Sequence, residues 1–218
     1  MSRPLPPPDD ATLARLRAAA RDLAALGDRD LLAGIGAALA LWRGPDGLAV
    51  RAAREIAGRS GASEAMLAFG LRRMIAAHKR AGLARWLAEA RAEAVAPGAR
   101  RRVSRLRAPA LGSETVLGPE VLLQVLAGNV AGLALPAVME ALLARSAVLV
   151  KPAAEEPVTA QFFKESLDRA APALGRAVAV AGDRQSVSLL DHILRHAVAH
   201  ETDTYKSDRW LRPSKYLP

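Results

Sequence analysis

Two polar residues each stand at the end of a short apolar run rich in valine and leucine. Asn129 closes the run that begins at Val121, and Lys151 closes the run that begins at Ala147. Such runs are typical of strands that are buried on both faces of a parallel sheet. A carboxamide offers a hydrogen-bond donor and an acceptor, and an ammonium group offers a positive charge. The pair therefore predicts a binding site for a small ligand.

The segment between the two runs predicts how they are positioned. Residues 133–144 place apolar side chains on all sides of a helix, with Pro136 near its start. A strand, a helix and a strand of these lengths form a βαβ unit with parallel strands and a right-handed crossover. Asn129 and Lys151 would then lie at the same carboxyl edge. Adjacent strands are about 4.8 Å apart, so one ligand could contact both residues.

The composition narrows the class of protein. Hydrophobic residues make up 51% of the 218, so a core is expected. The net charge of +9 comes largely from arginines scattered along helical segments, which favours solvated faces over nucleic-acid binding. There is no cysteine, which excludes disulfides, thiolate metal sites and a thiol nucleophile within these residues.

Targeting signals are also missing from the sequence. The proline-rich start lacks the apolar core of a signal peptide. No apolar run approaches the ~20 residues of a membrane helix. We expect a soluble, cytoplasmic protein with no membrane span.

The first half of the chain has the pattern of a helical region. Residues 1–10 are proline-rich and expected to be disordered, and residues 11–107 carry five helical segments followed by a basic linker. Asp28 is placed to cap the second helix. His78, Trp42 and Trp86 lie on apolar stripes and are interpreted as packing residues.

The second half alternates strands and helices. Residues 108–199 form an α/β domain in this reading, with a helix starting at Glu155-Glu156-Pro157 and a third strand at Ala177–Ala181 that ends in Gly182. Ser186–Arg195 predicts a further helix, and residues 200–218 read as an irregular tail.

Two other groups of residues suggest different chemistry. Arg100–Arg107 could attract a phosphorylated cofactor or nucleic acid, although such runs are more often surface linkers. His192, His196 and His200 would share a helix face and could hold zinc. However, Ala197–Ala199 suits a strand, and the zinc-binding HExxH pattern is missing, so metal binding is not favoured.

A standard dinucleotide fingerprint is also missing. The stretch Ala127–Gly132 has two glycines but not the GxGxxG spacing. The next helix begins with Glu155-Glu156, which would repel a pyrophosphate at its N-terminus. A dinucleotide would need a different pose at this edge.

Several of these stretches together resemble a known family. Leu126–Pro136, Leu143–Lys151 and Glu156-Pro157 are similar to the luminescence-type acyl-CoA reductases, a branch of the aldehyde dehydrogenase superfamily. Ser63–Leu71 and Leu83–Ala90 also resemble the region before that family's cofactor domain. The resemblance runs from about residue 12 to about residue 195. It implies a helical N-terminal region followed by a partial Rossmann-like, aldehyde-dehydrogenase-like α/β sheet.

The resemblance implies a reaction and a cofactor. The family reduces fatty acyl-CoA or other acyl thioesters to aldehydes with NADPH, through a cysteine thiolate that takes the acyl group. Asn129 would donate to the oxyanion, and Lys151 would contact the adenosine ribose or its 2′-phosphate. NAD-preferring relatives often carry a glutamate three residues after that lysine, where Ala154 stands here, so NADPH is favoured. The implied cofactor-binding residues are Ala127, Gly128, Asn129, Lys151, Pro152, Ala153, Ala154 and Gly182.

The sequence departs from the family in one decisive respect, because the family's nucleophilic cysteine is missing from these residues. We therefore expect the N-terminal portion of an NADPH-dependent acyl-CoA reductase that is inactive alone. Its partners would be an acyl thioester and a second copy or partner chain, because the partial sheet would leave an edge open. The alternatives are a non-catalytic nucleotide-binding or subunit-pairing module and, less favoured, a nucleic-acid-binding protein.

Overall fold

The computed structural model describes residues 10–95, 119–128 and 130–182. The helices are α1 (Asp10–Ala25), α2 (Asp28–Ala40), α3 (Leu48–Ser60), α4 (Glu64–Ala77), α5 (Arg80–Val95), α6 (Ala134–Leu143), α7 (Val158–Ala170) and α8 (Pro172–Arg176). The strands are β1 (Val121–Val125), β2 (Ala147–Lys151) and β3 (Val178–Val180). In this part of the chain, no helix has both the length and the apolar character needed to cross a membrane.

The three strands form one parallel sheet in the order β1-β2-β3. This confirms the predicted βαβ unit, with α6 as the crossover between β1 and β2. The strand β2 is buried from Ala147 to Val150 because it has a neighbour on each side. The expectation that β1 is buried on both faces is wrong. As an outer strand of this sheet it is only half-buried, and 57% of Val125 is exposed.

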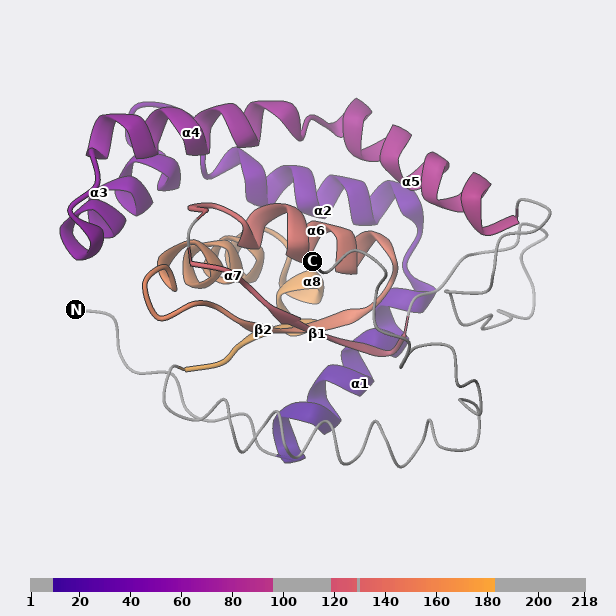
Figure 1. Cartoon of the computed structure of the whole chain (residues 1–218). Helices are drawn as coiled ribbons and strands as arrows, with labels where there is room; N and C mark the ends of the chain where they lie inside the picture. The colour runs from indigo at the N-terminus through magenta and orange to yellow at the C-terminus, as the bar shows by residue number, and fades with distance from the viewer. Residues whose placement is uncertain (1–9, 96–118, 129, 183–218) are drawn as a thin grey trace, which may run out of the picture.

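Helices cover both faces of the sheet (Figure 1). The crossover helices α6 and α7 lie on one face, and α1 crosses the opposite face in contact with all three strands. The helix α2 packs over α7, and α4 and α5 lie outside α2. The helical first half of the chain therefore encloses the sheet instead of standing beside it.

A buried arginine joins the two halves of the chain. Arg145, in the turn before β2, is only 4% exposed and adopts a positive φ of 60°. Its guanidinium donates to the carbonyl oxygens of Leu23 (3.1 Å) and Leu26 and to Asp28 Oδ1 (2.5 Å). The prediction that Asp28 caps α2 is therefore wrong. Gly27 is the N-cap, and the Asp28 carboxylate neutralises a buried charge instead.

Trp42 forms a second link between the halves. It is fully buried, and its indole N–H donates to Ser166 Oγ on α7 at 3.1 Å. Its ring also meets Phe163 edge to face, with centroids 6.2 Å apart. Trp42 is thus the core anchor that was predicted, whereas Trp86 is only half-buried and lies beside His78. The His78 ring is hydrogen-bonded to the Met74 carbonyl at 2.7 Å, in keeping with a packing role.

Candidate functional site

Lys151 lies at the carboxyl end of β2, as predicted. It is opposite Val125 in the parallel register, and its carbonyl oxygen accepts from the Leu126 N–H at 3.0 Å. The residue is half-buried, and within the described ranges no hydrogen bond or ion pair engages its ammonium group. Asn129, the other predicted polar residue, lies outside the described residues. Its proximity to Lys151 stays a prediction.

The loop after β2 carries most of the other predicted cofactor residues. Pro152 is buried, Ala153 is half-buried, and Ala154 is exposed. Arg59, in the last turn of α3, donates from Nη2 to the Ala154 carbonyl oxygen at 3.3 Å. No sequence pattern pointed to Arg59, because it lies 95 residues away from Ala154 along the chain. A second cation thus stands next to the segment that follows Lys151.

The loop after β1 closely approaches the loop after β2 at Gly128. A Cβ atom at Gly128 would lie 2.7 Å from Glu155 Oε2 and 3.0 Å from the Cβ of Ala153. A larger residue at Gly128 would therefore have to displace the Glu155 carboxylate, which is the end of an exposed flexible side chain, and would crowd Ala153. The structure therefore brings Gly128 and Ala153 together, with the exposed Glu155 carboxylate beside them.

The neighbouring Glu156 is buried and has a different role. Its Oε1 accepts from both the backbone N–H and the hydroxyl of Thr159 at 2.8 Å. The backbone N–H groups of Val158 and Gly132 also donate to this carboxylate. Burial raises the pKa of Glu156 above its ordinary value, and these hydrogen bonds partly oppose the rise. The carboxylate thus occupies the N-terminus of α7, where an anionic ligand would otherwise bind.

Gly132 fixes the far end of the β1–α6 loop. It has a φ of +89°, which only glycine adopts without strain. A Cβ there would lie 2.8 Å from Leu71 Cδ2 and 3.1 Å from Met74 Sδ, both on α4. The loop after β1 is therefore held between α4 and the Glu156 carboxylate.

The remaining predicted residues fall in two groups. Ala127 is exposed at the end of β1, and Gly182 is half-buried just beyond β3 at the same carboxyl edge. The Ala181 N–H donates to the Val150 carbonyl at 2.8 Å, which keeps this end of β3 beside β2. The basic run Arg100–Arg107, the predicted helix Ser186–Arg195 and the histidines His192, His196 and His200 lie outside the described residues.

Taken together, these features define an α/β protein whose small parallel sheet carries glycines and cations at its carboxyl edge. Residues 26–200 match the model of a protein family described as acyl-CoA reductase (LuxC). Because the match covers most of the chain, the chain belongs to this family, and the predicted resemblance is confirmed. Membership supports an acyl-CoA reductase-like function with an acyl thioester as substrate. Comparisons with curated proteins and with solved structures gave no match.

Proposed function

We propose that this chain supplies the NADPH-binding part of an acyl-CoA reductase, with the cofactor at the carboxyl edge of β1 and β2. The observation that carries the proposal is the pair of cations around the loop after β2. Lys151 ends the strand before the loop, and Arg59 donates to Ala154 within it. Since Ala154 has no carboxylate, no negative side chain at that position repels a 2′-phosphate.

The residues at this edge are compatible with a dinucleotide, but not in the ordinary pose. The N-terminus of α7 is filled by Glu156, so the pyrophosphate would not lie there. Gly128 would instead let the ligand approach the backbone of the loop after β1. The cofactor when bound supplies a hydride for reduction of the acyl group. Asn129 would donate its amide hydrogens to the developing oxyanion, as the family resemblance implies.

The reaction also requires a thiol. Reduction through an acyl-enzyme intermediate needs a cysteine, and none of the 218 residues is one. We propose that the thiol comes from outside these residues, in a further segment or a partner chain. The 218-residue chain alone should then show no acyl-CoA-dependent oxidation of NADPH. Sustained turnover with stoichiometric aldehyde would contradict this part of the proposal.

Cofactor titration tests the proposal directly. NADPH and NADH are titrated by fluorescence into wild type, Lys151→Ala and Arg59→Gln. A partly exposed cation beside a phosphate contributes about 1 kcal/mol, so each variant should bind NADPH about fivefold more weakly. NADH affinity should change less because NADH has no 2′-phosphate. Equal losses for both cofactors, or no saturable binding by wild type, would contradict the proposal.

Glu155 provides an opposing control at the same site. Its exposed carboxylate lies against Gly128, where it would repel the phosphates of the cofactor. Glu155→Gln should therefore strengthen NADPH binding by about twofold to fivefold. If the substitution instead weakens NADH binding, Glu155 accepts hydrogen bonds from the ribose and the site prefers NADH.

The division of the chain into two regions extends the proposal. We propose that residues 11–107 form a helical region with a basic linker, and that residues 108–199 form part of an aldehyde-dehydrogenase-like cofactor domain. The open side of β1, where Val125 is exposed, would suit a second copy or a partner chain. Light scattering at micromolar concentration tests this pairing, and a sharp monomer mass would contradict it.

A further inference from the structure

A second basic site lies away from the sheet edge, between α2 and the junction of α4 with α5. A cavity of about 590 Å³ is lined there by Trp42, Arg43, Gly44, Arg72, Ile75, Ala76, Lys79 and Arg80. None of these residues belongs to the edge that carries Lys151. The volume is within the range of about 300–1,000 Å³ that is typical of small-molecule sites.

The cavity has an apolar floor and a cationic rim. Trp42 and Ile75 are 0% and 2% exposed and form part of the floor. The four cationic residues are exposed, and no acidic residue is among the lining residues. Asp46 follows in the turn after α2 but does not line the cavity.

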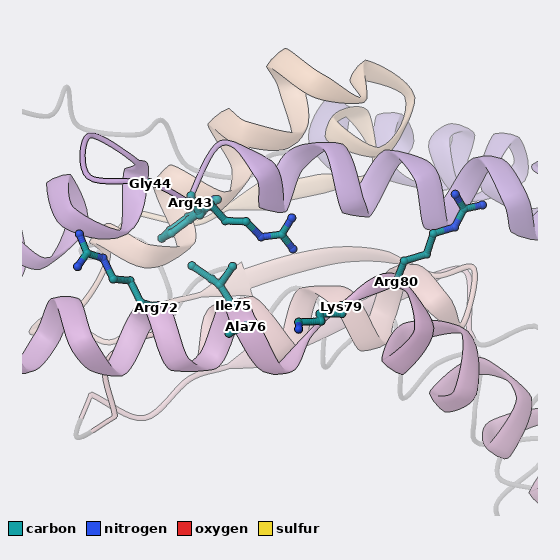
Figure 2. A pocket seen from close by; sticks show the side chains of 8 residues that line it. Arg43, Gly44, Arg72, Ile75, Ala76, Lys79 and Arg80 are labelled. Carbon is teal, nitrogen blue, oxygen red and sulfur yellow. The ribbon is translucent and has the colours of Figure 1, made fainter.

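The cations are spread around the cavity instead of meeting at one point. Figure 2 shows Arg43 reaching into the gap between α2 and α4, Lys79 at the end of α4, and the head groups of Arg72 and Arg80 toward opposite ends of the gap. Arg43 follows α2, Arg72 lies within α4, and Lys79 and Arg80 lie at the junction of α4 with α5, so the four cations come from separate segments. Among the described residues, none of these four side chains makes a hydrogen bond or an ion pair.

This arrangement selects the chemistry of a ligand. Unpaired cations held in one hollow repel one another, and a multiply charged anion removes that repulsion. A single carboxylate or phosphate could not engage cations spread over this span, whereas two or more phosphate groups could. Arginine also offers paired donors that match phosphate oxygens. The hollow is partly open to solvent, and its volume of about 590 Å³ is that of a small-molecule site.

We infer that the cavity between α2 and α4 binds a small molecule that carries two or more phosphate groups. The molecule could be a nucleotide phosphorylated at two positions, like the nucleotide end of an acyl-CoA, or an inorganic polyphosphate. The nucleotide source rests on the proposed function, whereas phosphate binding by this cavity does not. Trp42, the floor of the cavity, is also hydrogen-bonded to α7, so the site is anchored to the core of the sheet.

Calorimetric titration of the full 218-residue chain tests the inference, with tripolyphosphate and adenosine 3′,5′-bisphosphate as probes at about 0.15 M salt. The test variant is Arg43→Gln with Lys79→Gln. The control is Arg17→Gln with Arg21→Gln, which removes the same charge from exposed positions on α1, across the sheet. Wild type should bind one equivalent of a probe. The test variant should bind about tenfold more weakly or worse, and the control should change less than about twofold.

The outcomes separate the explanations. Equal weakening of probe binding by both double variants would mean that only the net charge matters, and this would overturn the inference. A lack of saturable probe binding to wild type would also overturn it. Tighter binding of adenosine 3′,5′-bisphosphate than of tripolyphosphate supports the nucleotide source, and the reverse supports inorganic polyphosphate. Lys151→Ala should leave probe binding unchanged. The cofactor proposal and this one can therefore fail separately.

Discussion

The two loops at the carboxyl edge of the sheet are held in different ways. The loop after β1 is buried only at its far end, where Gly132 packs against α4 and its N–H donates to Glu156, while Ala127 and Val130 are exposed. The loop after β2 presents exposed Ala154 and Glu155 and is touched by exposed Arg59. The helical region therefore supports the first loop at Gly132, and leaves the Gly128 end of that loop and the exposed part of the second loop accessible to a ligand. Substitutions at Gly132 and Glu156 should therefore change stability, and substitutions at Lys151, Arg59 and Glu155 should change binding.

The largest effect is expected at Gly132. Gly132→Ala places a side chain at a φ of +89° and against Leu71 and Met74. The strained backbone and the overpacking together should lower the free energy of unfolding by about 2–5 kcal/mol, measured by urea denaturation. Gly70 on α4 is the control, because a Cβ there meets nothing within 4 Å. Gly70→Ala should raise stability by up to about 1 kcal/mol. Similar effects at both glycines would contradict the role of Gly132 in holding the loop after β1 against α4.

The second-largest difference in stability is expected between substitutions of the adjacent glutamates Glu155 and Glu156. Glu156→Ala leaves the donors of Thr159 and Gly132 without their acceptor and should lower the free energy of unfolding by about 1–3 kcal/mol. Glu155→Ala removes an exposed carboxylate and should change it by less than about 0.5 kcal/mol. Chemical denaturation of the two variants side by side measures the contrast. A larger loss at Glu155 would reverse the assignment of roles.

The pH dependence of stability should also report on Glu156. Its pKa is raised in the folded state, so the folded protein holds this proton more tightly than the unfolded chain. That contribution is fully present below the unfolded pKa and is lost as the pH rises through the folded pKa. Relative to Glu156→Gln, wild type should therefore lose stability as the pH rises above the ordinary glutamate value. Parallel pH profiles for the two proteins would show that the carboxyl does not titrate abnormally.

The smallest effect on stability is expected at Arg59. Its hydrogen bond to Ala154 is exposed to solvent, so Arg59→Gln should change the free energy of unfolding by less than about 0.5 kcal/mol. The same substitution should nevertheless weaken NADPH binding. A loss of stability above about 2 kcal/mol would instead make Arg59 a structural support of the second loop.

Local patterns predicted the parts of the fold that local physics decides. The unbroken apolar run Ala147–Val150 predicts a buried strand, and the structure buries these residues. The parallel pairing with β1 followed from the length of the helix between them. The prediction that β1 is buried on both faces is wrong. Burial of a strand depends on whether it is a central or an edge strand, and a short apolar run does not encode that position.

Long-range contacts account for what the sequence did not reveal. Asp28 has the residue type of a helix cap, but Arg145 lies 117 positions away and takes its carboxylate. Arg59 reaches Ala154 from another helix, and Glu156 reaches Gly132 across two loops. Each of these contacts joins segments that are far apart in the sequence, and no helical or strand periodicity relates their positions. The candidate site was therefore located by its strand ends, while its supporting residues became visible only in the fold.

Hydrogen–deuterium exchange with saturating NADPH tests most directly whether the carboxyl edge of β1 and β2 holds the cofactor. We predict slower exchange in residues 126–132 and 152–158 of wild type, with less protection in Lys151→Ala and little with NADH at the same concentration. Protection that appears instead around the cavity between α2 and α4, or none at the edge under saturating cofactor, would contradict the account.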